Sequence, residues 1–432
     1  MLKINPLKTI VKAGCIAITG SDPFVLKSCM KYAKEHDIYF ICEATVNQVN
    51  QFGGYTGMKP GDYAGLVQEL AREIDFPIEK VILSGDHLGP FAWQHLDSKT
   101  AMEYSKELVR QYVAAGFRKI HLDPTMPLAD DDRSRFGNEI IARRAAELAA
   151  VSEQTYEATK NDTLWTYRPA YVIGSEVPVP GGTEEEESIQ VTTPEDLASS
   201  IETFKSAFRS AGLPQVCEDI VAVVAQIGVE FSDLAVHEYN HIAAAELSSE
   251  LKKYPDIRFE SHSSDYQTPE CLRHMVQDGV GILKVGPEIT FSLREGFFAL
   301  SMIENELASL YGFSPSGLIE VLENTMVTAK PNYWQNYYHG SIHQQAFKRK
   351  YSFSDRSRYY FAQPAVKDAV SRLMKNLTDI YIPLTIISQY LPLQYHKIRS
   401  GELNNDPVSI LENKVMSVIH RYYMSMLEAH KP

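Results

Sequence analysis

Short apolar stretches rich in β-branched residues alternate with helix-like stretches along the first two thirds of the chain. Each apolar stretch runs directly into polar residues and shows little alternation, which is typical of strands buried on both faces, as parallel strands are. Eight such stretches occur: GCIAIT, YFICEAT, KVILSGDH, KIHLDPT, AYVIGSEV, IVAVVAQIG, RFESHSSD and GILKVGP. Eight strand–helix units in succession predict a TIM barrel, an α/β fold whose chemistry lies at the C-terminal ends of its parallel strands.

An open doubly wound sheet is the alternative for such a pattern, but it would concentrate polar residues at one switch point. Here polar residues follow strands two to eight, so the barrel is favoured. The residues before Gly14 predict a short helix that plugs the bottom of the barrel. The helices are expected at about 22–36, 61–75, 98–115, 138–159, 194–211, 233–254, 268–278 and 289–310.

From about residue 311 the chain becomes aromatic-rich and helical, without further strand signals. We therefore expect a barrel over 1–310 and a helical extension over 311–432 that packs on the barrel. Two long loops are also expected at the catalytic face. The loop after strand two (NQVNQFGGYTGMKP) is Gly-rich and polar, and the loop after strand five (VPVPGGTEEEESIQVTTP) carries an acidic tip. Loops of this length in compact domains are usually binding loops or lids.

Composition narrows the class of protein. The chain has 432 residues and a formal net charge of −13, which argues against nucleic acid or an anionic membrane as a partner. The five cysteines show no CxxC spacing, so neither a disulfide framework nor a zinc ribbon is expected. Without an apolar run of spanning length or a signal-like start, the sequence predicts a cytoplasmic protein.

Two histidines at predicted strand ends suggest a metal site. Asp86 and His87 end strand three, and His262 ends strand seven. A neutral imidazole binds a divalent cation, while a neighbouring carboxylate can transfer a proton. Glu176 and Gln226 end the strands between, so two histidines with either of them predict a catalytic Zn²⁺ or Mn²⁺ site. The alternative is structural: helix capping, packing, and hydrogen bonds in a polar mouth.

Other residues at predicted strand ends are candidates for substrate binding or acid–base catalysis. Lys284 after strand eight can anchor a substrate oxyanion or form a Schiff base, and the anchor needs no special pKa. His121 and Asp123 are two residues apart and should project together, as acid–base groups or as partners of sugar hydroxyls. Glu43 can accept hydrogen bonds from sugar hydroxyls, and so many acceptors suit a polyol ligand.

Several longer motifs resemble one known family from end to end. They include EATVNQVNQFGGYTGM, GDHLGP, AAGFRKIHLD, IGSEVPVPGG, HSSDYQT, ILKVGP, TFSLREGFFAL and YSFSDRSRYYF. They resemble the GatZ/KbaZ family, the accessory (Z) subunits of class II D-tagatose-1,6-bisphosphate aldolase. The resemblance implies a TIM barrel related to metal-dependent class II aldolases, and a separate catalytic Y subunit as partner. Some homologues are instead free-standing, metal-dependent ketose 4-epimerases.

Individual roles follow from this resemblance by position. The GDH motif implies that His87 binds metal and that Asp86 transfers protons, and His262 takes the place of a metal histidine. Gln226 stands where the aldolases keep another histidine. Ser263 and Asp265 replace part of a small-residue segment that exposes backbone amides to a substrate phosphate, and an aspartate there would repel phosphate.

The expected function is therefore an accessory aldolase subunit that supports a Y subunit. The alternative is a ketose 4-epimerase for fructose, tagatose or related sugars, acting by retro-aldol cleavage and reclosure of the C3–C4 bond with Asp86 or Glu176 as base. A homo-oligomer is expected in either case. A sugar kinase fits poorly, because no phosphate-cradling motif occurs in the sequence.

Overall fold

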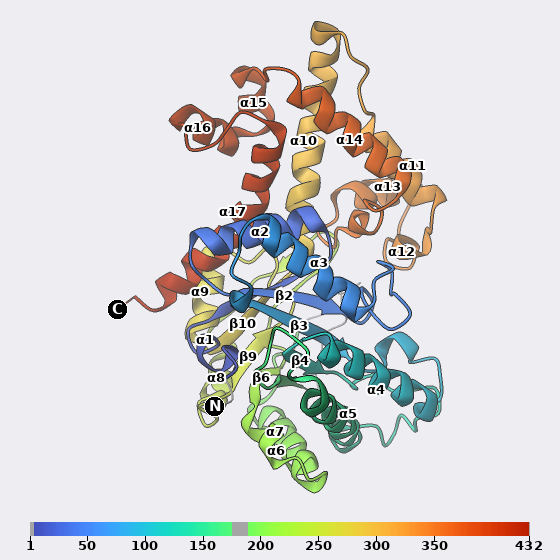
Figure 1. Ribbon diagram of the computed structural model, residues 1–432, viewed down its shortest axis with the longest axis vertical. Helices are drawn as coiled ribbons and strands as arrows, with labels where there is room; N and C mark the ends of the chain where they lie inside the picture. The colour runs from blue at the N-terminus through green and yellow to red at the C-terminus, as the bar shows by residue number, and fades with distance from the viewer. Residues whose placement is uncertain (1–3, 175–188, 432) are drawn as a thin grey trace.

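The computed structural model describes residues 4–174 and 189–431, and eight parallel strands in it close into a barrel (Figure 1). The barrel confirms the predicted fold class, and every predicted strand is present. Going round the barrel, each strand pairs with the next barrel strand along the chain, and β10 closes on β1. The strands are β1 (Cys15–Thr19), β2 (Phe40–Thr45), β3 (Val81–Leu88), β4 (Lys119–Leu122), β5 (Ala170–Ile173), β6 (Ile220–Val224), β9 (Arg258–Ser261) and β10 (Val280–Val285).

Helices surround the strands close to the predicted positions. Side chains cap the first turns of two of these helices: Asp97 accepts a hydrogen bond from the Thr100 N–H at 3.0 Å, and Thr193 accepts one from the Asp196 N–H at 3.1 Å. These helices are α2 (Pro23–Glu35), α3 (Pro60–Glu73), α4 (Ser98–Ala114), α5 (Asn138–Thr159), α6 (Pro194–Ser210), α9 (Pro269–Gln277) and α10 (Pro287–Tyr311).

The expected helix over 233–254 is largely wrong. A two-stranded antiparallel hairpin, β7 (Glu230–Phe231) and β8 (Val236–His237), occupies its start, and only the short helix α8 (Ala245–Leu251) remains. The Ser232 hydroxyl, which could cap a helix here, instead accepts a hydrogen bond from the Ala235 N–H within the hairpin turn. The loop after β6 therefore folds as a hairpin at the mouth of the barrel.

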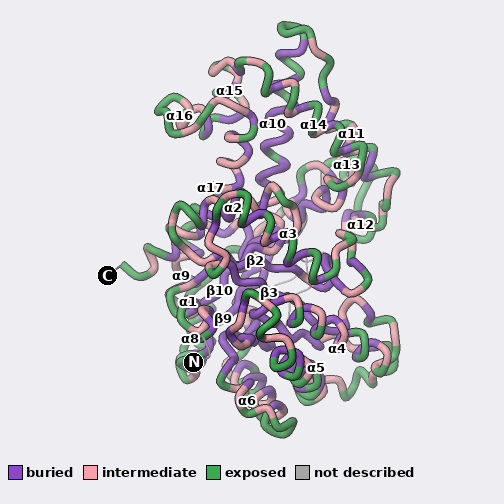
Figure 2. Tube along the Cα trace, viewed as in Figure 1, coloured by how far each residue is buried: buried purple, intermediate pink, exposed green. Residues whose placement is uncertain are grey.

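The lower part of the barrel interior is apolar. The short helix α1 (Leu7–Ile10) inserts Leu7 there, and Leu7 and Val11 pack with inward-facing strand residues, which confirms the predicted plug. Figure 2 shows the strands as the buried centre of the molecule. The cluster comprises Leu7, Val11, Cys15, Ala17, Ile41, Ile82, Ala170, Val172, Val221, Ala222, Val224 and Ile282.

After β10 the chain leaves the barrel along α10 and is helical throughout its described remainder. α10 projects away from the strands in Figure 1. The elements that follow are α11 (Leu318–Thr328), α12 (Asn332–Gln335), α13 (Ile342–Tyr351), the 3₁₀ turn η3 (Arg356–Tyr359), α14 (Pro364–Thr378), α15 (Leu384–Tyr390) and α16 (Pro392–Ser400). Of these, α11, η3, α14 and α15 pack against α10.

The last helix, α17 (Pro407–Ala429), returns to the barrel and packs against α2, α9 and β1. It lies between the helices that follow the first and seventh barrel strands, which is the place of the eighth barrel helix. Residues after 311 therefore contribute to the helical layer of the barrel, and the division at residue 310 stays a prediction. No helix in the described ranges is both long and apolar enough to cross a membrane.

Candidate functional site

The backbone at the end of β3 turns two consecutive side chains toward the mouth of the barrel. The pairing of β3 with β4 shifts register between Gly85 and Leu88, and His87 has a left-handed φ of 49°. Such strained backbone in a non-glycine residue concentrates at functional sites. Gly89 allows the close approach of the next strand end, because a Cβ there would lie 2.0 Å from the Asp123 carbonyl oxygen.

Two buried histidine–carboxylate pairs connect β3 with β4. The His87 Nδ1 lies 2.7 Å from an Asp123 carboxylate oxygen, and the His121 Nδ1 lies 2.7 Å from an Asp86 oxygen. All four side chains are buried. Asp123 and His121 thus project together as their spacing predicts, and each carboxylate fixes the orientation of one imidazole.

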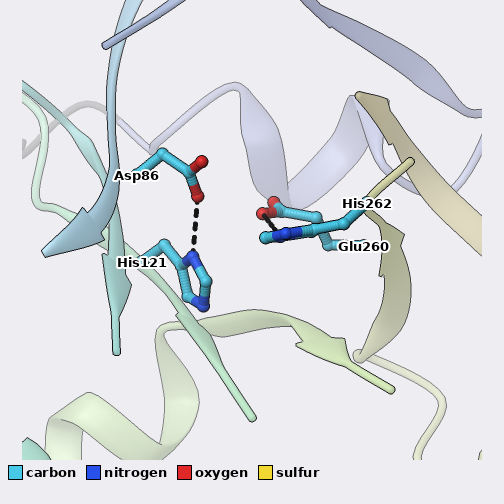
Figure 3. Close-up of side chains that lie close together, drawn as sticks. All are labelled: Asp86, His121, Glu260 and His262. Carbon is cyan, nitrogen blue, oxygen red and sulfur yellow. Dashed lines mark hydrogen bonds and ion pairs between the residues drawn. The ribbon is translucent and has the colours of Figure 1, made fainter. Parts of the chain in front are cut away.

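The strand-seven histidine joins this group from the far side of the barrel. The His262 ring centroid lies 5.0 Å from that of His87 and 5.3 Å from that of His121. Its Nε2 is 3.2 Å from a carboxylate oxygen of Glu260, two residues earlier on β9. Asp86, His121, Glu260 and His262 each offer one ligand atom, and these atoms all lie within 4.8 Å of one another (Figure 3).

Two lysines neutralise the carboxylates of the interior. Lys119 is fully buried and lies 2.6 Å from carboxylate oxygens of both Glu43 and Glu260. Lys284 contacts Asp86, is 3.1 Å from a Glu43 oxygen, and lies 3.3 Å from the His262 Nε2. The top of the barrel interior is therefore a connected network of charged groups, which satisfies the general requirement that buried charges be paired.

Charges in this network determine the protonation of the candidate ligands. Burial disfavours an ionised Asp86, but His87 and Lys284 outweigh it and hold the pKa of its carboxyl well below the ordinary value. Burial and then Lys284 hold the pKa of His262 well below its usual range, so this imidazole is neutral. A charged carboxylate and a neutral imidazole are the forms that bind a metal ion.

A divalent metal ion fits these residues. With its proton on Nδ1, His121 donates to Asp86 and leaves the lone pair of Nε2 free. That Nε2 is buried and has no hydrogen-bond partner among the described residues. Metal-binding histidines characteristically donate their other ring N–H to a carboxylate, and two imidazoles with two carboxylates suit Zn²⁺ or Mn²⁺.

A cavity of about 200 Å³ opens above this cluster. Six of the predicted site residues line this cavity: Asp86, His87, His262, Ser263, Asp265 and Lys284. The loop after β2 supplies Asn47, Gln48 and Tyr55, in agreement with its expected place at the catalytic face. Across from the barrel, Tyr337, Arg356, Arg358 and Tyr359 of the helical extension complete the wall.

Two predicted site residues hold local backbone: Gln226, which does not line the cavity, and Asp265, which does. The Gln226 amide oxygen accepts hydrogen bonds from the N–H groups of Gly228 and Val229, so it stabilises the loop after β6 apart from the histidines. Asp265 accepts from the N–H groups of Gly286 and Glu288 at the start of α10.

Two further predicted residues, Glu43 and Glu176, are not among the residues that the described part of the chain brings to the cavity wall. Glu43 lies beneath it, held by Thr19, Ser84 and both lysines. Glu176 lies outside the described residues.

Two members of the network, Glu260 and Lys119, were missed by sequence reasoning that considered only strand ends. Each lies two residues before a predicted site residue on the same strand. Period-two alternation therefore places Glu260 on the same side as His262, and Lys119 on the same side as His121. A charged residue at an inward position of a buried strand is the signal that would have found both.

Comparisons with known proteins define the class to which the chain belongs. Residues 3–426 match the model of the family described as D-tagatose-1,6-bisphosphate aldolase subunit GatZ/KbaZ-like. The match covers nearly the whole chain, so this protein belongs to the GatZ/KbaZ-like family, as the motifs predict.

Among solved structures, a probable tagatose 6 phosphate kinase from Sinorhizobium meliloti 1021 is 38% identical, with a TM-score of 0.86. The alignment covers 95% of this chain and 100% of that chain. The fructose-bisphosphate aldolase from Campylobacter jejuni is 15% identical over 86% of this chain and 91% of that chain, with a TM-score of 0.43. The YdjI aldolase from Escherichia coli K12 is 10% identical over 85% of this chain and 97% of that chain, with a TM-score of 0.41.

Proposed function

We propose that this chain itself breaks and re-forms a carbon–carbon bond of a ketose, as a metal-dependent ketose 4-epimerase of the tagatose/fructose type. The observation that carries the proposal is the buried Nε2 of His121, which has no hydrogen-bond partner among the described residues and belongs to a group of four side chains that could hold a metal ion. A purely structural interior would have little reason to retain an imidazole nitrogen in this state, because an unpaired buried polar atom costs about 1–3 kcal/mol.

The residues of the cluster divide the chemistry between them. His121, His262 and the carboxylates of Asp86 and Glu260 would hold the ion, which would polarise the C2 carbonyl of the ketose. Lys284 lines the cavity and is placed to anchor a substrate oxygen that becomes negatively charged.

The proton of the C4 hydroxyl would pass to the Nε2 of His87, because Asp86 is taken up as a candidate metal ligand. Burial lowers the pKa of this imidazole, but Asp86 and Asp123 outweigh burial and raise the pKa above the ordinary value. Asp123 holds the other nitrogen of that ring. Loss of this proton and cleavage of C3–C4 leave an aldehyde and an enediolate, which keeps the electron pair of the broken bond. Addition of the enediolate to the other face of the aldehyde, with return of the proton to the C4 oxygen, gives the epimer.

The second candidate is the accessory role, favoured by the family description as an aldolase subunit. In that role the chain would bind and support a Y subunit in the cytoplasm, and the cluster would contribute to the shared activity. Both candidates use a divalent ion, so the requirement for a partner subunit separates them. The absence of a phosphate-cradling motif speaks against transfer from a nucleotide.

Metal content provides the direct test of the site. We expect the purified chain to bind about one Zn²⁺ or Mn²⁺, and His121→Ala and His262→Ala to lose it, while the exposed His95→Ala retains it. Elemental analysis after dialysis measures this binding without an activity assay. Equal metal content in all four proteins would contradict the site.

Turnover then separates the two functions. The chain alone, loaded with Zn²⁺ or Mn²⁺, should interconvert tagatose and fructose or their phosphates, and a chelator or His87→Ala should abolish the reaction. Turnover that requires an added Y subunit would support the accessory role instead.

A further inference from the structure

Two arginines of the helical extension reach the cavity above the metal-binding cluster. Arg356 and Arg358 lie on η3 and line the same cavity as Asp86, His262 and Lys284. Arg356 is only 4% exposed. Neither guanidinium forms an ion pair with a carboxylate of the described residues, unlike Arg294 and Arg349 of the same extension, which pair with Asp355 and Glu323.

Aromatic rings and carbonyls hold the two guanidinium groups in place. Arg356 stacks over Tyr337 and donates to the Tyr333 carbonyl at 3.1 Å, while its Nε is buried without a partner among the described residues. Arg358 donates to the Asp355 carbonyl at 2.9 Å and to the Tyr359 hydroxyl at 2.9 Å. These contacts orient the arginines, and the carboxylate of Asp355 attracts Arg358, but neither guanidinium has an ion pair among the described residues. A buried charge without an ion pair is costly.

The turn before η3 is anchored on the barrel. Asp355 has a left-handed φ of 42°, and its carboxylate accepts hydrogen bonds from Thr290 at 2.5 Å and Arg294 at 3.2 Å, both on α10. Because α10 begins directly after β10, this turn fixes the arginines relative to Lys284 at the end of that strand. Strained backbone that is held by several contacts is characteristic of ligand-binding positions.

The acidic groups of the cavity wall do not neutralise the arginines. Asp22 accepts hydrogen bonds from the N–H groups of Phe24 and Val25, and Asp265 accepts from those of Gly286 and Glu288. Both carboxylates therefore cap helices. The repulsion of phosphate that the sequence suggests for Asp265 is then offset on the opposite wall by two cations.

We propose that Arg356 and Arg358 form an anion-binding subsite that holds a charged terminal group of the ketose, a phosphate ester or a carboxylate, while the reacting carbons lie over the metal-binding cluster. The inference rests on the proposed function for the identity of the rest of the ligand. It makes the helical extension part of the binding site. Arginine suits this task because its planar fork of donors matches the oxygens of phosphate and carboxylate groups.

Binding of inorganic phosphate tests the subsite without turnover. Isothermal titration calorimetry of the full chain should detect phosphate binding, and Arg358→Gln and Arg356→Gln should each weaken it at least about tenfold, the effect of losing one charge-assisted contact. Arg358→Lys keeps the charge but not the fork, so we expect an intermediate loss. The matched control is Arg349→Gln, which removes another buried arginine stacked on an aromatic ring, Trp334, outside the cavity wall.

Competition identifies the class of ligand. Displacement of phosphate by fructose 6-phosphate, by a hexuronate and by fructose distinguishes a phosphate ester, a carboxylate and a neutral sugar. Circular dichroism confirms that each variant is folded, and if the glutamine variants unfold, the lysine variants at both positions carry the test.

Two results would overturn the subsite: no phosphate binding by the unmodified chain, or equal binding by the arginine variants and the Arg349→Gln control. Arginine-dependent binding without turnover of any ketose would refute the proposed epimerase while leaving the subsite intact. Equal turnover of neutral and phosphorylated ketoses without phosphate binding would refute the subsite and leave the proposed epimerase intact.

Discussion

The two ends of the barrel interior are built from the same strands but contain opposite chemistry. Along β2, Ile41 belongs to the apolar lower cluster, and Glu43, two residues later, belongs to the charged network. Along β10, Ile282 and Lys284 repeat this change. Two residues along a strand thus separate the apolar cluster, which stabilises the fold, from the network of ionised groups. The charged network therefore lies directly on a packed apolar layer in the interior of the barrel.

The largest expected effect on stability comes from removal of Lys119, the most buried cation of the charged network. In Lys119→Met, Glu43 and Glu260 lose the ammonium group that lies 2.6 Å from each of them. Breaking a buried ion pair by deleting one partner costs about 3–5 kcal/mol. We expect a loss of that size in the free energy of unfolding, measured by urea denaturation near neutral pH.

A second substitution serves as the control for Lys119. In the double variant Lys119→Met/Glu260→Gln one uncompensated carboxylate is removed, so a large part of the lost stability should return. A loss below about 1 kcal/mol in the single variant would mean that water or Lys284 already compensates these carboxylates, and the network would then be far less closely coupled than its distances indicate.

The apolar end should respond with a smaller loss and no change in metal binding. Leu7 is fully buried in the lower cluster, and Leu7→Ala removes its packing with the inward-facing strand residues. We expect a loss of about 2–3 kcal/mol, the lower part of the range for such truncations, because the plug lies at the end of the barrel where it can relax. Metal content of the folded variant should equal that of the unmodified chain. Reduced metal content would show that the two ends are not independent.

The difference between the two ends also explains what the sequence could predict. The β-branched runs identified all eight barrel strands, because burial on both faces imposes a strong local pattern. The strand-end rule found the histidines, since the mouth of a barrel gathers strand ends. Lys119 and Glu260 escaped that rule, although alternation places them inward.

Contacts between distant segments could not be predicted in the same way. Arg356 reaches the cavity through packing of the extension on α10, and the Gln226 amide turns to its own loop. The return of α17 to the barrel likewise depends on contacts that no local pattern encodes. These features are determined by tertiary packing, whereas strands and helix caps are determined by neighbours in the chain.

The smallest expected effect is a pH dependence of the free energy of unfolding that comes from Asp265, at the charged end of the barrel interior. Burial and the charge of Glu288 raise the pKa of Asp265 to about 7, well above that of an unfolded aspartate. The raised value means that protonation favours the folded state, so this contribution is present at low pH and is lost as the pH rises through about 7. Asp265→Asn removes the titration, yet it keeps an oxygen for both N–H groups, because both bonds go to Oδ1.

We therefore expect Asp265→Asn to gain stability relative to the unmodified chain as the pH rises from 6 to 8, by about 1–2 kcal/mol. Unfolding free energies of both proteins at the two pH values measure this difference, in which all other titrating groups cancel. Leu7→Ala is the matched control, since it lacks a titrating group and should lose the same stability at both pH values. Parallel profiles for Asp265→Asn and the unmodified chain would show that this carboxyl titrates normally. Its cap on α10 would then stabilise the mouth through hydrogen bonds alone, and the electrostatic contrast between the two ends of the barrel would lie entirely in the lysine-paired network.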